Sequence, residues 1–63
     1  MNFKIKEIIN RRQKTFYDMI NHVEYSNGIL TLFLSDYTYQ DELSYLFKLD
    51  FLEINKDIVI IIK

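Results

Sequence analysis

The chain has 63 residues, a net charge of −1 at pH 7 and no cysteine, which indicates one small domain and excludes disulfide bonds and zinc–thiolate sites. Hydrophobic residues make up 49% of the chain, yet no apolar run approaches the roughly 20 residues of a membrane span. The near-neutral charge provides no overall attraction to nucleic acid, and the charged N-terminus is unlike a signal peptide, so we expect a protein of the cytoplasm.

A helix is predicted over residues 3–20. The apolar positions in and just after this segment fall on one arc about 120° wide at helical spacing, as expected of a core-facing helix. They are Ile5, Ile8, Ile9, Phe16, Met19, Ile20 and Val23. Arg12 interrupts the arc, and β-branched residues are frequent. An alternative interpretation therefore takes residues 3–9 and 15–25 as strands joined by a turn at residues 11–14.

A β-hairpin is predicted over residues 21–35. Asn27 and Gly28 supply the positive φ angles of a two-residue type I′ turn, which sets the pairing of the strands. The predicted pairs run from Ser26–Ile29 to Asn21–Leu34. Because side chains alternate along a strand, one face collects Val23, Tyr25, Leu30, Leu32 and Leu34. The other face collects His22, Glu24, Thr31 and Ser35, with Ile29 and Phe33 as apolar exceptions.

A second helix is predicted over residues 39–48. Thr38 and Asp41 resemble a capping box at its start. The apolar residues that recur at helical spacing are Tyr39, Leu43, Leu46 and Phe47. Acidic residues near the start and Lys48 near the end suit the helix dipole, which supports this assignment.

Two C-terminal strands are predicted over residues 51–55 and 58–62, with a turn at residues 55–57. The second strand is entirely apolar, whereas a strand with one solvent-facing side would alternate with polar residues. Two helices in so short a chain cover only one face of a sheet, and the uncovered apolar surface favours association. We therefore predict a homo-oligomer whose interface includes Ile58, Val59, Ile60, Ile61 and Ile62.

Together these elements predict an α+β fold within a single domain spanning residues 1–63. A small antiparallel sheet is built on hairpin 21–35 and strands 51–55 and 58–62, and both helices lie on one of its faces. The alternative is a nearly all-β meander in which only residues 39–48 are helical.

The sequence contains no catalytic or metal-binding constellation. Zinc requires three or four converging ligands, and the chain offers one histidine, His22, on the outer face of the hairpin. Nucleophilic catalysis needs a base beside a serine or threonine, and a single glycine cannot form a phosphate-binding loop. We therefore expect no enzymatic activity, no cofactor and no metal.

Residues 36–42 form the strongest candidate for partner binding, because tyrosines are over-represented in binding hot spots and acids flank them here. The candidate residues are Asp36, Tyr37, Tyr39, Asp41 and Glu42. The alternative is that this segment only connects a strand to a helix. The chain favours residues with AT-rich codons and lacks alanine and proline, which indicates a low-GC genome. By analogy of size and origin, we predict a non-catalytic binding module of a phage or mobile element that inhibits or redirects a host protein in the host cytoplasm.

A small nucleic-acid-binding regulator is the alternative function. Its phosphate contacts would come from cations of the first predicted helix, namely Lys4, Arg11, Arg12 and Lys14. Glu7 lies on the same helix face and neutralises part of this charge. Phosphate binding weakens steeply with salt, whereas a tyrosine-centred protein interface does not, so salt dependence distinguishes the two functions.

Overall fold

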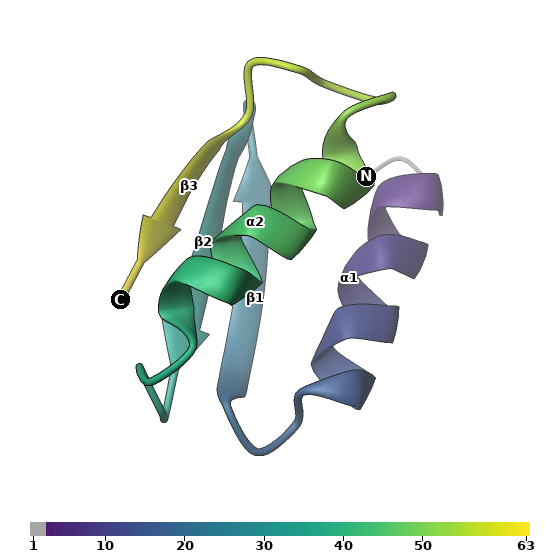
Figure 1. Ribbon diagram of the computed structural model, residues 1–63. Helices are drawn as coiled ribbons and strands as arrows, with labels where there is room; N and C mark the ends of the chain where they lie inside the picture. Colours follow the sequence, from purple (N-terminus) through teal and green to yellow (C-terminus); the bar gives the residue numbers. More distant parts are fainter. Residues whose placement is uncertain (1–2) are drawn as a thin grey trace.

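In the computed structural model, residues 3–63 are described and form two helices and three strands (Figure 1). In chain order they are α1 (Phe3–Thr15), β1 (Ile20–Ser26), β2 (Ile29–Leu34), α2 (Gln40–Phe51) and β3 (Val59–Ile62). The strands make one sheet in the order β1-β2-β3, and both helices lie on the same face of it (Figure 1). The predicted α+β class is confirmed, and the all-β alternative is wrong because α1 is helical.

The hairpin forms around the predicted turn. Asn27 has φ 52° and Gly28 has φ 78°, so both central residues adopt the left-handed conformation of a type I′ turn. A Cβ at Gly28 would also lie 3.3 Å from the Asn55 side-chain nitrogen. The predicted pairs are confirmed from Ser26–Ile29 to His22–Phe33.

The hairpin departs from the prediction at its open end. Leu34 pairs with Ile20, and not with Asn21, because a bulge inserts one extra residue into β1. Without that bulge, strict alternation would direct the polar Asn21 toward the core and the apolar Ile20 away from it. With it, Ile20 is buried and Asn21 is exposed. The bulge therefore keeps the core face apolar up to the end of the strand.

Helix α1 ends at Thr15, so the predicted end at residue 20 is wrong. Residues 16–19 form a turn, in which the Phe16 carbonyl accepts hydrogen bonds from the backbone N–H groups of Met19 and Ile20. Phe16 and Met19 still pack against the core from this turn. The apolar arc continued past the helix because the turn and the start of β1 face the same core.

Helix α2 starts one residue later and ends three residues later than predicted. Tyr39 occupies the N-cap position without a side-chain capping bond, so the predicted capping box is wrong. The Thr38 backbone N–H instead donates to the Asp36 carboxylate at 2.9 Å, in a turn that precedes the helix. The predicted strand at residues 51–55 is also wrong, because the helix continues to the fully buried Phe51 and is followed by turns.

Strand β3 lies parallel to β2, which corrects the prediction of an entirely antiparallel sheet. α2 follows β2 in the chain and carries it back along the sheet, so the chain enters β3 at the same end of the sheet at which it entered β2. The register pairs Leu30 with Ile60 and Leu32 with Ile62. The predicted strand at 58–62 is confirmed within one residue of its start.

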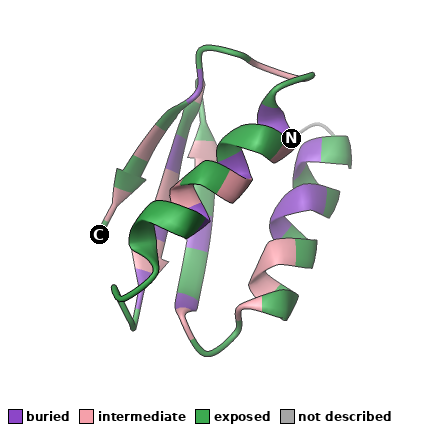
Figure 2. Ribbon diagram, viewed as in Figure 1, coloured by how far each residue is buried: buried purple, intermediate pink, exposed green. Residues whose placement is uncertain are grey.

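The core lies between the two helices and one face of the sheet (Figure 2). Its buried residues are Ile5, Ile8, Ile9, Ile20, Val23, Leu30, Leu32, Leu34, Leu43, Phe47, Phe51 and Ile58. The predicted core face of the hairpin is confirmed, with Tyr25 partly buried at its edge. No described element covers the opposite face of the sheet within residues 3–63.

Candidate protein-binding surfaces

The predicted tyrosine–acid segment, residues 36–42, is exposed along its whole length. The Tyr37 and Tyr39 residues are 49% and 50% exposed, so neither is packed in the core. Hydrogen bonding by the side chain and backbone of Thr38 lowers the pKa of Asp36 below its ordinary value and favours the charged carboxylate. The segment therefore presents two half-exposed tyrosines beside charged acids.

Asp41 and Glu42 occupy the first turn of α2, where the helix dipole favours negative charge. Within residues 3–63 neither these two acids nor Asp36 forms an ion pair. The three carboxylates are thus available to a basic partner.

A second exposed surface lies on α2 and was not found from the sequence. Tyr45, Leu49 and Leu52 are 63%, 48% and 53% exposed, and their spacing of four and three residues places them on one face. We call these three residues the outer stripe of α2. They lie opposite the buried Leu43, Phe47 and Phe51, and Figure 2 shows this side of the helix as mostly exposed. Apolar residues on both faces of one helix are the signal that could have revealed the stripe.

Most of the cations predicted to contact nucleic acid form ion pairs with acidic residues in or just after α2. The Arg12 Nε donates to Asp50 Oδ2 at 2.6 Å, and its Nη2 donates to Asp50 Oδ1 at 2.9 Å. Arg11 lies 3.5 Å from the same carboxylate, and the Lys4 Nζ lies 3.8 Å from Glu53. Lys14 is exposed and forms no ion pair within residues 3–63.

The Arg12–Asp50 pair explains why a cation interrupts the apolar arc of α1. Only 22% of the Arg12 side chain and 11% of the Asp50 side chain are exposed. The hydrogen bond to Asp50 raises the pKa of Arg12 above its already high ordinary value, so the guanidinium remains charged. Arg12 therefore joins α1 to α2, and its cationic head is not presented to a phosphate backbone.

The uncovered sheet face carries part of the predicted oligomer interface. Val59 is 53% exposed, Ile29 41% and Ile61 37%, and β2–β3 pairing places Ile29 beside Val59. The structure separates the other predicted interface residues from these, because Ile58 is buried and both Ile60 and Ile62 pack against the core. Only the alternate residues of β3 face outward.

His22 lies on this outer sheet face, as predicted. Its Nε2 is 3.3 Å from a Glu24 carboxylate oxygen, and its ring centroid lies 5.6 Å from that of Phe33. In the described part of the chain, no three histidine, cysteine or carboxylate side chains converge as metal ligands would. No helix within residues 3–63 has the length and apolar character needed to cross a membrane.

Comparison of the chain with protein-family models, curated proteins and solved structures finds no match. The surfaces described above are therefore the basis for a function. They consist of the tyrosine–acid segment, the outer stripe of α2 and the uncovered sheet face.

Proposed function

We propose that this protein is a non-catalytic protein-binding module that engages a basic partner through the tyrosine–acid segment and the outer stripe of α2. The observation that carries the proposal is the continuity of these two surfaces. Glu42 lies three residues before Tyr45, so the last acid of the segment and the first residue of the stripe share one face of α2. Exposed tyrosine and leucine side chains supply apolar contact area, and unpaired carboxylates flank them.

The charge distribution favours this function over nucleic-acid binding. Phosphate contacts need unpaired cations, and three of the four candidate cations lie beside carboxylates. The acids of the tyrosine–acid segment have no such partners within the described residues. Among the four candidate cations only Lys14 lies outside an ion pair within residues 3–63, whereas all three acids of the segment do, so the balance favours the acidic surface.

Tyr37→Ala tests this function in affinity capture from a lysate of the source cell, with nuclease added. We expect a captured protein to bind the variant about 1–3 kcal/mol more weakly, because the substitution removes the contact area of an exposed tyrosine. The core keeps all its side chains, so the fold should be unchanged. Lys14→Ala is the matched control and is expected to bind like the wild type. Binding that depends on Lys14, is lost with nuclease and is insensitive to Tyr37→Ala would instead support the nucleic-acid alternative.

We also propose that the bound protein belongs to a host and that this chain, encoded by a phage or mobile element, inhibits or redirects it. Support comes from the small size of the chain and its preference for amino acids with AT-rich codons, and the step is one of analogy. Genes for phage or plasmid functions beside the coding sequence would agree with this origin, whereas a position within a chromosomal operon would contradict it.

We further propose that a second copy of the chain covers the uncovered sheet face. Face-to-face packing would bury Ile29, Val59 and Ile61, whereas edge-to-edge pairing would leave them exposed. Light scattering at micromolar concentration is expected to give twice the chain mass of 7.7 kDa. The double variant Val59→Lys/Ile61→Lys is expected to be folded and monomeric, and Ile60→Lys is expected to unfold because Ile60 packs against the core. A wild-type monomer at high concentration would refute the dimer.

A further inference from the structure

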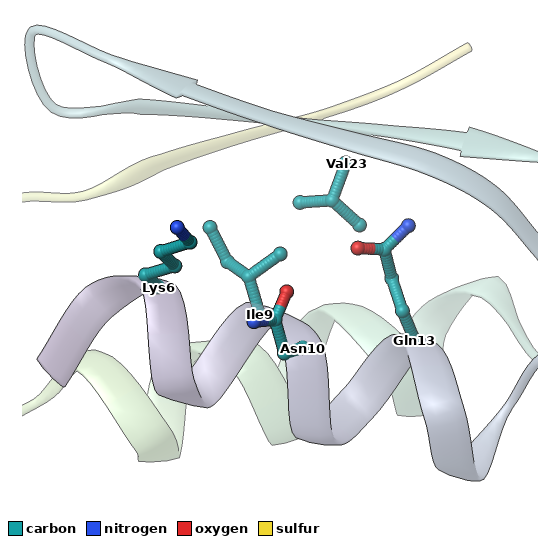
Figure 3. A pocket seen from close by; sticks show the side chains of 5 residues that line it. All are labelled: Lys6, Ile9, Asn10, Gln13 and Val23. Carbon is teal, nitrogen blue, oxygen red and sulfur yellow. The ribbon is translucent and has the colours of Figure 1, made fainter. Parts of the chain in front are cut away.

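A groove separates α1 from β1. It has a volume of about 310 Å³ and is lined by Lys6, Ile9, Asn10, Gln13 and Val23. Figure 3 shows Ile9 and Val23 facing each other across it, with the polar side chains of α1 along the helix side. Ile9 and Val23 are 6% and 7% exposed, so the floor is apolar and the rim is polar.

The strand beside this groove is an edge of the sheet. β1 pairs with β2 alone, so its other side is unpaired within the described sheet, and α1 lies on the helix-covered face next to that edge (Figure 1). In a hairpin with a two-residue loop, Ser26 and Ile29 are a hydrogen-bonded pair, and such pairs alternate along the strands. Val23 and Tyr25 therefore direct their backbone N–H and C=O groups away from β2, toward the free edge.

The charge around the groove is positive and uncompensated. Lys6 lines the groove, is exposed and forms no ion pair within residues 3–63. Arg11 and Arg12 instead lie on the flank of α1 that faces Asp50. No acidic residue lines the groove, and Glu24 of β1 lies on the opposite face of the sheet, beside His22.

We propose that the groove binds an extended acidic segment of a partner protein, which adds to the sheet as a fourth strand along β1. The backbone of the segment pairs with the outward N–H and C=O groups of Val23 and Tyr25. Alternate side chains of such a strand point to the helix side, where an apolar one covers Ile9 and Val23. A carboxylate two residues along the strand points to the same side and meets the ammonium of Lys6. This site is separate from the tyrosine–acid segment, so an experiment can refute binding at one site without refuting binding at the other.

The free edge of β3 is the competing site for strand addition. Val59 of β3 and Lys63, which follows the strand, donate backbone hydrogen bonds toward β2, so Ile60 and Ile62 direct their backbone groups outward by alternation. Lys63 follows β3 and supplies a cation at that edge, but no groove is described beside it. Backbone groups and a lysine are available at both edges, and the apolar floor of the groove favours β1.

Nuclear magnetic resonance titration of the whole protein with defined peptides tests the proposal. The probe is a blocked seven-residue peptide with threonine at the odd positions and glutamate, valine and glutamate at positions 2, 4 and 6, so that valine and glutamate share one face of the strand. A second peptide has lysine in place of glutamate, and a third has N-methylated backbone nitrogens at alternate positions. We expect the first peptide to shift the amide signals of Val23 and Tyr25 and the α1 signals from Lys6 to Gln13. The lysine and N-methylated peptides are expected to bind at least about fivefold more weakly.

Lys6→Glu tests the contribution of the Lys6 charge to peptide binding. Because the side chain is exposed, the substitution is expected to leave the fold intact. This variant is expected to keep the wild-type spectrum and to bind the acidic peptide about fivefold more weakly. Lys56→Glu, at an exposed turn outside the groove, is the matched control and should leave the affinity unchanged. Shifts centred on Ile60 and Ile62, equal binding of the lysine peptide, or no shifts at millimolar peptide would each overturn the proposal.

Discussion

Phe47→Ala is expected to remove most of the stability of the protein. Phe47 is 0% exposed and is among the largest fully buried side chains of the described chain. Replacing a buried phenylalanine by alanine costs about 3–5 kcal/mol, whereas a domain of this length has a total stability of about 3–9 kcal/mol. The substitution therefore removes most of the free energy of unfolding.

Circular dichroism during urea titration measures this loss. Tyr45→Ala is the matched control, because it truncates an aromatic residue of the same helix that is 63% exposed, and it is expected to change stability by less than about 0.5 kcal/mol. Phe47→Leu is expected to be intermediate, since it leaves a smaller cavity. Equal effects of the Phe47 and Tyr45 alanine variants would show that α2 does not pack on the sheet by this face.

Asp50→Ala is expected to destabilise the protein by about 1–3 kcal/mol, because it leaves the Arg12 guanidinium without its acceptor. The Asp50 carboxylate receives both guanidinium hydrogen bonds of Arg12, and its side chain is 11% exposed. The two residues are 38 positions apart in the sequence, so the pair ties the first helix to the end of the second.

A double-mutant cycle measures the coupling between these residues. The double variant Arg12→Met/Asp50→Leu is expected to recover most of the stability lost in Asp50→Ala, since apolar replacement of both partners removes the unpaired charge. Glu53→Ala serves as the control and should have little effect, because Glu53 and Lys4 are 86% and 62% exposed at the side chain. Additive effects of the Arg12 and Asp50 substitutions would contradict the pairing.

Several features of the candidate site could be predicted because they depend on local sequence. The exposure of Tyr37 and the acids follows from their position after the last strand residue, in a polar connection. The outer stripe of α2 was missed, because helical periodicity marks Tyr45 and Leu49 as apolar without showing which face meets the sheet. The groove was missed as well, since Lys6 and Val23 belong to different elements and meet only in the folded chain.

The sequence by itself determined the hairpin. Asn27 and Gly28 set the turn, and the alternation that follows directs Val23, Leu30 and Leu32 to the core. Each of these contacts joins residues that are close along the chain, so local backbone preferences suffice to specify them.

Only the tertiary structure decided the end of α1, the direction of β3 and the role of Arg12. An apolar arc predicts burial but not conformation, so it could not separate the helix from the turn at residues 16–19. β3 runs parallel to β2 because α2 carries the chain back across the sheet. Arg12 tolerates its place in the apolar arc because Asp50 meets it from another helix. These outcomes depend on partners far apart in sequence, whose meeting is set by the packing of whole elements.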